Sequence, residues 1–372
     1  MNRLILLGNG FDLAHGMKTG YNDFILWYLK CRFQIAYDDH QYQDELISLK
    51  RDWLNETLQF GNTINGVSEY IDYYYKNGFN DLLSNRDLTI YSTNYRPFFK
   101  VELKSIFLKR LLLNCNSATW VDIENEYYEE LKRILESKHE ENKFKELSEL
   151  NLTLKVLINC LSEYLKTINN IPTIKGYLSI FEEEILKDDI ATIELAENIL
   201  PINTKVLNFN YTSTIQNYLV KKAPHFSKFS ADVNYIHGRL SDDKNPLIFG
   251  FGDELDEFYL RMEHEKTKGF LDYIKSFWYF KTSNYHDLIR FIDSDDFQIF
   301  ILGHSCGLSD RTMLNMIFEH QNCKSIKIFY HKHDERTNFT HLTQEISKHF
   351  RNKGEMRKKI VSFDRSSPMP QI

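Results

Sequence analysis

The sequence predicts an α/β protein, with a mostly parallel β-sheet and a large helical insertion. Two observations carry this prediction. Short runs that are almost continuously apolar lie near both ends of the chain and alternate with helical patterns, as is typical of buried parallel strands. Residues 21–200 between them are polar-aromatic and helical in pattern. We therefore expect an α/β domain formed by residues 1–20 and 201–372, and a helical insertion formed by residues 21–200.

The first strand is predicted at the start of the chain, in the apolar run Leu4-Ile5-Leu6-Leu7. Similar short runs predict the later strands. These runs are residues 205–209, 233–236, 246–249, 297–302, 326–330 and 359–363. The run at 297–302 is the strongest of them, so we expect it to be a fully buried strand.

The clearest helix of the insertion is predicted over residues 144–168. Its apolar residues recur in alternating steps of three and four, which places them in one seam along the helix. The seam consists of Leu147, Leu150, Leu154, Leu157, Leu161, Tyr164 and Ile168. We expect it to pack against the sheet, and dimerisation through it, giving a homo-oligomer, is the alternative.

The composition bounds the class of protein. The 372-residue chain has 26% charged residues and a formal net charge of −6, which argues mildly against broad nucleic-acid binding but not against a nucleotide pocket. The five cysteines form no C-x-x-C pair, and the first strand begins without room for a leader. No run reaches the roughly 18 apolar residues of a membrane helix. We expect a soluble, cytoplasmic protein with no membrane partner.

Two closely spaced glycines follow the first strand, in the order Gly8-Asn9-Gly10. A strand that ends in such glycines and turns helical is how α/β folds hold a phosphate, because glycine permits close approach and the helix offers N–H groups. The spacing is G-x-G-x5-G, and the carboxylates Asp38 and Asp39 lie too far along the chain for a dinucleotide-dependent dehydrogenase. We therefore predict phosphate binding without hydride transfer, and a plain strand–helix turn is the alternative.

Two polar residues follow later predicted strands, where side chains face the ligand crevice of a parallel sheet. Asn210 carries a carboxamide suited to orienting a ribose hydroxyl or a water molecule, and helix capping is its alternative role. His237 precedes a glycine, and an imidazole is suited to proton transfer near neutral pH. A purely structural histidine is the alternative. Both residues are candidate catalytic groups.

The last cluster, residues 303–310, follows the strongest predicted strand. It contains G-x-S-x-G, the nucleophile elbow of α/β-hydrolases, with Ser305 as nucleophile and Asp334 with His341 or His349 as partners. The chain after Ser305 is short for that fold, and no H-G-G-G stretch lies upstream. The simpler interpretation is a second glycine-rich ligand loop. Its candidate ligand-binding residues are Gly303, His304, Ser305 and Asp310.

Together these clusters resemble the bacterial abortive-infection AbiH family of phage-defence proteins. The matching motifs occur in order: L-G-N-G-F-D-L-A-H-G at 7–16, F-N-Y-T at 209–212, I-H-G at 236–238 and G-H-S-x-G-x-S-D at 303–310. Residues 120–124 also look like the W-x-D-x-E element of that family. On a helix Glu124 would face an apolar core and need a partner, and an edge glutamate is the alternative. The resemblance spans the chain and implies a phage-defence effector.

The same motifs resemble, more distantly, those of sirtuin-like NAD-binding domains, which implies a Rossmann-like, sirtuin-like sheet. In that family the glycine loop holds the pyrophosphate, and the residues matching Asn210 and His237 face the nicotinamide ribose. The loop matching residues 303–305 contacts the adenosine side, and defence members use the Asn and the His to hydrolyse NAD. The resemblance thus implies NAD as ligand or substrate. The implied binding loop consists of Gly8, Asn9, Gly10 and Asp12.

The chain departs from the sirtuin-like pattern at two positions of the glycine loop. Asp12 replaces a hydroxyl residue and would repel a phosphate unless it faces a ribose, a cation or backbone N–H groups, and Lys18 replaces a proline. The zinc-binding cysteine pairs of protein-deacetylating sirtuins are absent from the sequence. No metal site and no acyl-lysine removal are therefore expected.

The leading hypothesis is a phage-defence effector that binds NAD or a related nucleotide and hydrolyses its N-glycosidic bond, with Asn210 and His237 as catalytic residues. A serine hydrolase that uses Ser305, and a non-catalytic nucleotide sensor, are the alternatives. Such an effector must be held inactive until infection. This requirement implies a phage-derived trigger, a partner protein or a change of oligomeric state.

Overall fold

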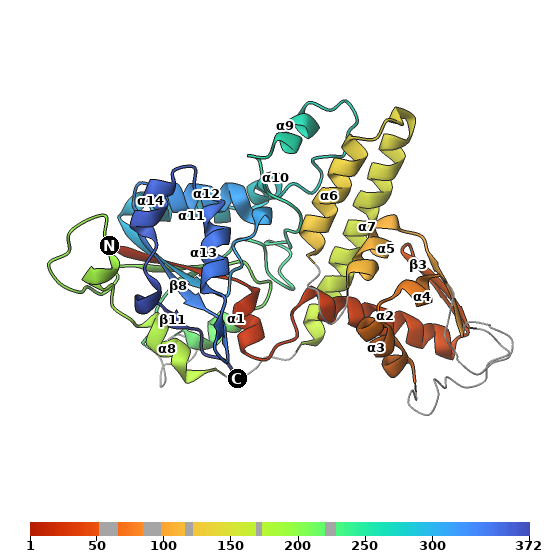
Figure 1. The fold of residues 1–372 in the computed structure, drawn as a ribbon, viewed down its shortest axis with the longest axis horizontal. Coiled ribbons are helices and arrows are strands. Elements are labelled where there is room, and N and C mark those ends of the chain that lie inside the picture. Colours follow the sequence, from red (N-terminus) through yellow and green to blue (C-terminus); the bar gives the residue numbers. More distant parts are fainter. Residues whose placement is uncertain (52–65, 85–97, 116–121, 169–172, 220–227) are drawn as a thin grey trace. The chain divides into compact units, whose positions relative to one another are not determined.

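The computed structural model describes residues 1–51, 66–84, 98–115, 122–168, 173–219 and 228–372 (Figure 1). The chain divides into two compact units. The first unit comprises Met1–Thr19, Ile168–Arg261 and Tyr273–Ile372, and the second comprises Gly20–Thr167 and Met262–Asp272. The first unit thus takes in residues 168–200, which had been predicted to belong to the helical insertion. Among the described residues, no helix combines the length and the apolarity needed to cross a bilayer.

A six-stranded sheet forms the centre of the first unit. All of its strand pairs are parallel, in the order β11-β8-β7-β1-β5-β6, which confirms the predicted α/β class. Its strands are β1 (Asn2–Leu7), β5 (Thr204–Asn208), β6 (Asp232–Tyr235), β7 (Phe297–Leu302), β8 (Cys323–Tyr330) and β11 (Ser367–Pro368). A separate antiparallel hairpin pairs β9 (Lys332–His333) with β10 (Arg336–Thr337).

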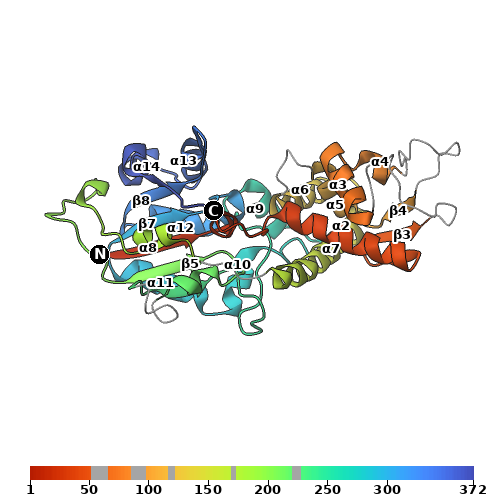
Figure 2. The same cartoon turned by 90° about the horizontal axis from the view of Figure 1, so that it is seen from below.

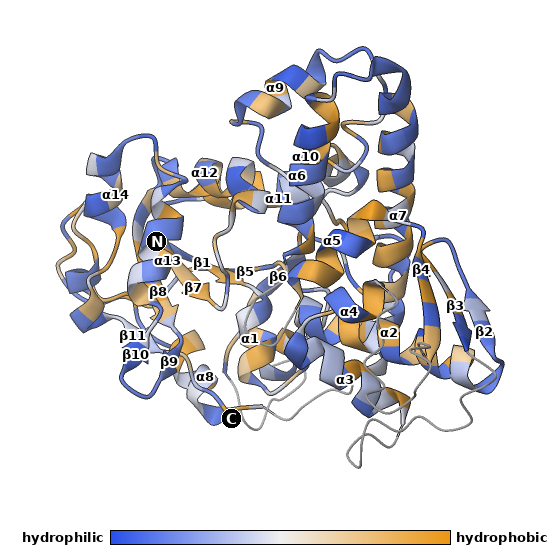
Figure 3. Ribbon diagram, turned by 45° about the vertical axis from the view of Figure 1, so that its right-hand side comes forward, coloured by the Kyte–Doolittle hydropathy of each residue, from blue (hydrophilic) through white to orange (hydrophobic). Residues whose placement is uncertain are grey.

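Both faces of the sheet are covered, so β1 and β7 are buried along their whole length and are mostly apolar (Figure 3). In β1, Leu4 and Leu6 point to one face and Ile5 and Leu7 to the other, as the two-residue period of a strand requires. The first face packs against helices α11 (Asn284–Ser294), α12 (Arg311–Glu319) and α13 (Phe339–Ser347), and the second against α1 (Asn9–Ala14) and α8 (Lys175–Phe181) (Figures 1 and 2). The unit is therefore a three-layer α/β/α structure.

The helices of the first unit are mostly short. They are α1 (Asn9–Ala14), α8 (Lys175–Phe181), α10 (Lys275–Trp278), α11 (Asn284–Ser294), α12 (Arg311–Glu319), α13 (Phe339–Ser347) and α14 (Lys353–Lys359). Helix α9 (Glu257–Glu263) begins in the first unit and ends in the second.

The strand order reverses beside β1. From β1 the chain continues to β5 and then β6 on one side, and it returns to β7 and β8 on the other side. In an open parallel sheet, such a reversal leaves a crevice at the carboxyl ends of the two strands that flank it. The loops that follow β1 and β7 therefore lie at the position where this fold binds ligands.

Glycines allow the loops after β1 and β7 to pack directly on each other. A Cβ at Gly8 would lie 2.5 Å from Cα of His304, and a Cβ at Gly10 would lie 2.8 Å from Cα of Gly303. Gly303 itself has φ +71°, a left-handed conformation that favours glycine, and a Cβ there would overlap the backbone nitrogen of Phe11. The close approach that these glycines permit is thus between two loops of the protein.

Two of the predicted strands are wrong. Residues 246–249 form no strand, because Pro246 has no N–H to donate to a neighbouring strand. The N–H of Ile248 instead donates to His237 O at 2.8 Å, which holds the segment in place. Residues 359–363 form no strand either, because α14 runs through Lys359 and only an isolated bridge at Ile360 reaches β8. The three basic residues at the end of α14 favour a helix C-terminus there.

The second unit is mainly helical. Its helices are α2 (Tyr21–Asp38), α3 (Val67–Asn77), α4 (Asn80–Leu83), α5 (Ile106–Asn114), α6 (Ile123–Leu135) and α7 (Glu140–Thr167). It also contains an antiparallel sheet that the sequence analysis missed, formed by β2 (Gln41–Gln43), β3 (Ile47–Arg51) and β4 (Phe99–Leu103).

Helix α7 confirms the helix predicted over 144–168. Its leucine seam is buried, and the helix packs against α2, α5 and α6 of the same unit. The apolar seam is therefore accounted for within the helical unit, where we had expected packing on the sheet.

The packing of the two loops predicts a sharp difference between two glycines of the same segment. Gly303→Ala should destabilise the first unit by about 2–5 kcal/mol, because it combines a left-handed φ with a backbone overlap. Gly307→Ala is the matched control, since a Cβ at Gly307 would meet only Ser305 Oγ at 3.6 Å. Thermal and urea unfolding of the two variants measure the difference, and equal losses would contradict this account of the loop packing.

Candidate functional site

The sequence clusters of the first unit meet at the carboxyl edge of the sheet. Gly303 follows β7, Gly8 follows β1, Asn210 lies just beyond β5, and His237 lies just beyond β6. These four strands are consecutive neighbours in the sheet. Motifs that are up to 295 positions apart in the sequence therefore occupy one edge.

Hydrogen bonds join the first three of these clusters. The N–H of Gly8 donates to Leu302 O at 3.1 Å, and the N–H of Gly10 donates to Gly303 O at 2.8 Å. The Asn210 carboxamide donates from Nδ2 to Gly8 O at 3.0 Å. The N–H groups of both glycines are thus engaged by protein carbonyls, and Asn210 holds the loop after β1 in place.

Asn9 has a local role in the same loop. Its Nδ2 donates to Thr19 O at 3.1 Å, and its Oδ1 accepts from the Thr19 hydroxyl at 2.5 Å. These paired bonds close the segment that contains α1, so the Asn9 side chain stabilises the loop.

Asp12 is a buried carboxylate with an unused oxygen. Its Oδ2 accepts a hydrogen bond from the Thr212 hydroxyl at 2.5 Å, but its Oδ1 is buried and has no hydrogen-bond partner. Burial raises the pKa of Asp12 to about 6, and the bond from Thr212 opposes this rise. An acceptor without a donor at the crevice is a position where a ligand hydroxyl would be stabilised.

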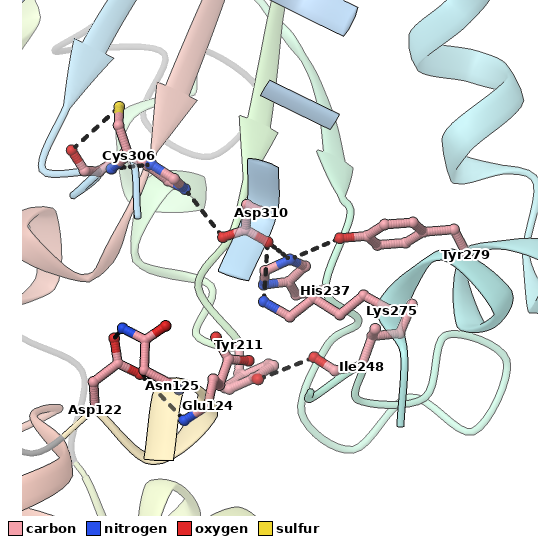
Figure 4. A network of polar contacts seen from close by, with 11 residues as sticks. Asp122, Glu124, Asn125, Tyr211, His237, Ile248, Lys275, Tyr279, Cys306 and Asp310 are labelled. Atoms are coloured by element: carbon pink, nitrogen blue, oxygen red, sulfur yellow. Dashed lines mark hydrogen bonds and ion pairs between the residues drawn. The ribbon is translucent and has the colours of Figure 1, made fainter. Parts of the chain in front are cut away.

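Asp310 is the centre of the buried network drawn in Figure 4. Its Oδ1 lies 3.0 Å from Nε2 of His237 and 2.9 Å from Nζ of Lys275. Tyr279 OH also lies 3.2 Å from His237 Nε2. All four side chains are buried, and Lys275 is 0% exposed. The imidazole of His237 is therefore held in a fixed orientation by an acid and a phenol.

The charges of this network are balanced by the pair of Lys275 and Asp310. Burial alone would raise the pKa of the Asp310 carboxyl, but Lys275, followed by His237, lowers it well below its usual range. Burial, with the nearby ammonium of Lys275, lowers the pKa of His237. The carboxylate also lies at the start of α12, where the helix dipole favours negative charge. Near neutral pH the site therefore holds an ionised Asp310 and a neutral His237.

His304 connects this network to the loop after β7. Its Nδ1 accepts a hydrogen bond from the Cys306 N–H at 3.0 Å, and its Nε2 lies 3.8 Å from Asp310 Oδ2. Burial lowers the pKa of His304 to about 4, so it is a neutral imidazole. The N–H of its Nε2 therefore faces the Asp310 carboxylate. His304 therefore lies next to Asp310, which its position in the predicted ligand loop did not indicate.

Ser305 is exposed, and no hydrogen bond joins it to a histidine among the described residues. Of its predicted partners, Asp334 pairs with His333, and His341 lies 3.8 Å from Glu345. His349 donates from Nε2 to Cys306 O at 2.7 Å. The geometry thus assembles none of the nominated acid–base partners around the Ser305 hydroxyl.

The W-x-D-x-E element falls in the second unit. Its Trp120 lies outside the described residues. Asp122 is the N-cap of α6 and accepts hydrogen bonds from the N–H groups of Glu124 and Asn125 at 3.1 Å each (Figure 4). Glu124 is buried, as the predicted helix face required. The aspartate of this element is therefore a capping residue.

The sequence analysis missed Lys275 and Tyr279. Neither belongs to a motif, and Lys275 reaches Asp310 across 35 positions of the sequence. The available signal was a single lysine within the largely apolar segment 273–280, because an ammonium flanked by large apolar residues is rarely buried without a partner, and a carboxylate is a common one.

Among the residues that the structure describes, no group of three or more His, Cys, Asp or Glu side chains could hold a metal ion.

A family model described as bacteriophage abortive infection AbiH matches residues 4–332, a range that contains all the clusters at the sheet edge. Comparison with curated proteins and with solved structures gives no match.

The raised pKa of Asp12 predicts a pH-dependent effect of its replacement. In the folded protein the Asp12 carboxyl keeps its proton up to about pH 6, whereas an ordinary aspartate has a pKa of 3.8. The contribution of protonated Asp12 to the free energy of unfolding is therefore lost as the pH rises through 6. Asp12→Asn should therefore raise the free energy of unfolding at pH 8, by up to about 3 kcal/mol, and change it little at pH 4. Urea unfolding at both pH values measures this. Asp243→Asn, an exposed control, should show no such difference, and an Asp12→Asn effect independent of pH would contradict the assignment.

The pairing of Lys275 with Asp310 predicts a large cost for removing one partner. Lys275→Met should destabilise the protein by about 3–5 kcal/mol, because it leaves a buried carboxylate uncompensated. Lys332→Met, which removes an exposed ammonium, should change stability little. Denaturant unfolding checks both variants. Adding Asp310→Asn to Lys275→Met should recover stability, and a double variant less stable than Lys275→Met would show that the charge pair is not the source of the cost.

Proposed function

The chain belongs to the bacteriophage abortive infection AbiH family, and we propose that it acts in phage defence by binding NAD or a related nucleotide and hydrolysing its N-glycosidic bond. One observation carries the proposal. Four clusters from different parts of the sequence meet at the carboxyl edge of a parallel sheet, beside the strand-order reversal, with a buried histidine–aspartate pair among them. This edge is where parallel sheets bind their ligands.

Recognition of the ligand in this proposal rests on Asp12 more than on the glycine amides. The N–H groups of Gly8 and Gly10 already donate to carbonyls of the protein. Asp12 offers a buried oxygen without a donor, and ribose hydroxyls are hydrogen-bond donors. A ribose seated against Asp12 would satisfy that oxygen and lower the cost of its burial. The ribose is also the sugar that carries the glycosidic bond of NAD.

His237 has the properties of a general base in this reaction. Its lowered pKa keeps it neutral near pH 7, and the ionised Asp310 would stabilise the imidazolium that forms when it takes a proton. Water attacks the anomeric carbon of the ribose as the bond to the nicotinamide nitrogen breaks. Nicotinamide leaves as a neutral molecule, and the proton of the water passes to His237. Asn210, fixed through Gly8, orients the ribose or the water.

The two alternatives are supported less by the geometry. A serine hydrolase needs a base within hydrogen-bond reach of Ser305, and its nominated partners are engaged elsewhere. A non-catalytic sensor needs no base at all. In that case the buried network around His237 would serve only to rigidify the site.

Mass spectrometry of NAD, nicotinamide and ADP-ribose tests the proposal in purified protein and in infected cells. The wild-type protein should consume NAD and release both products. His237→Gln retains a group that can bond Asp310 but cannot act as the base, so turnover should fall by roughly 10²-fold or more. Asn210→Ala should also reduce turnover, since it releases the loop after β1.

Asp243→Asn is the control for the catalytic variants, because Asp243 is exposed and belongs to none of the clusters at the sheet edge. Its activity should equal that of the wild type. Loss of activity in Ser305→Ala with retention in Asn210→Ala would favour the serine hydrolase. Unchanged NAD in infected cells that still display defence would overturn the proposed reaction.

A further inference from the structure

One cavity of the first unit lies between the start of α12 and the turn that joins α13 to α14. Its volume is about 520 Å³, which is within the range of small-molecule sites. Six of its nine lining residues are polar or charged, and the other three are Leu255, Leu308 and Phe350. The polar and charged residues are Arg311, Asn315, Lys348, His349, Arg351 and Lys353.

The lining is strongly cationic. It holds two arginines and two lysines, and no carboxylate lines the cavity among the described residues. Some of this charge is balanced from outside: Arg311 pairs with Asp253 at 3.0 Å, and Lys348 pairs with Glu345 at 2.7 Å. The carboxylate of Glu319 accepts the backbone N–H of Arg351 at 2.6 Å. Four cations thus belong to the lining and three carboxylates lie behind them, which leaves an excess of one positive charge among these groups and favours an anion.

His349 supplies the observation that distinguishes this cavity from a cluster of surface cations. The residue is 1% exposed and its Nε2 donates to Cys306 O at 2.7 Å, so its other nitrogen, Nδ1, is a hydrogen-bond acceptor. Burial lowers the pKa of His349, which keeps that nitrogen unprotonated. Nδ1 has no hydrogen-bond partner, and neither has Nε of Arg311. A buried acceptor and a buried donor, on two residues that line the cavity, thus both lack partners.

We propose that this cavity binds a sugar phosphate, with the phosphate on Arg351 and Lys348 and a sugar hydroxyl donating to Nδ1 of His349. Arginine and lysine are the side chains that recognise phosphate oxygens. A ligand that carried only an anion would leave the acceptor nitrogen unsatisfied, whereas a hydroxyl supplies the missing donor. The lining includes none of Asn210, His237, Lys275 and Asp310, so this proposal does not depend on the proposed hydrolysis of NAD.

Isothermal titration of the full-length protein with ribose 5-phosphate tests the site. Arg351→Ala and Lys348→Ala should each weaken binding about tenfold, the change expected when one charge-assisted hydrogen bond is lost. Arg336→Ala, which removes an exposed arginine charge in the same unit but outside the cavity, should bind as the wild type does. Equal affinities of Arg351→Ala and Arg336→Ala, or no binding to the wild type, would overturn the proposal.

His349→Gln separates the hydroxyl contact from the phosphate contact. A glutamine amide can replace the Nε2 donor to Cys306 O but has no acceptor at the position of Nδ1. This variant should bind ribose 5-phosphate about tenfold more weakly and inorganic phosphate as the wild type does. Equal weakening for both probes, or binding of inorganic phosphate alone, would contradict a sugar phosphate as the ligand.

A last variant keeps this test distinct from that of NAD hydrolysis. His237→Gln should leave the affinity for ribose 5-phosphate unchanged, whether or not the wild type turns over NAD. Loss of binding in His237→Gln would show that ribose 5-phosphate occupies the edge of the sheet, and would overturn the assignment to the cavity.

Discussion

The charge pair between Lys275 and Asp310 is the interaction on which the site depends. A carboxylate and an ammonium are both buried there, at 2.9 Å from each other, so neither could remain ionised without the other. Because Asp310 stays ionised, it orients the imidazole of His237 and faces that of His304. The pKa values of both histidines are lowered, so the protein presents neutral imidazoles beside a fixed negative charge.

Backbone contacts at the carboxyl edge of the sheet position this charge pair. Gly8 and Gly10 pack on Gly303, which draws the loop after β1 onto the loop that ends at Asp310. Asn210, which follows β5, links this third strand to the two loops by donating a hydrogen bond to the Gly8 carbonyl. Close packing and hydrogen bonding thus assemble the candidate site before any ligand binds. The proposed chemistry would use this preorganisation of His237, of its partner Asp310 and of the buried oxygen of Asp12.

Much of this arrangement could be predicted from the sequence, because continuous apolar runs mark buried parallel strands and the motif residues follow them directly. Asn210, His237 and Asp310 were found in this way. The sequence could not show that the glycines approach another loop instead of a ligand, since both need the same absence of a Cβ. It could not pair Lys275 with Asp310, which lies 35 positions away. Strand β4, F-K-V-E-L, alternates apolar and charged residues, but its two-residue period was overlooked within a region that is otherwise helical.

A crystal structure of the protein with ADP-ribose would test the central claim most directly, that the strand-order reversal holds a nucleotide. The account predicts ADP-ribose at the carboxyl ends of β1 and β7, with a ribose hydroxyl on Oδ1 of Asp12 and the anomeric carbon near His237 and Asn210. A nucleotide bound only in the cavity around Arg351 and His349, or a crevice that stays empty at saturating ADP-ribose, would contradict it.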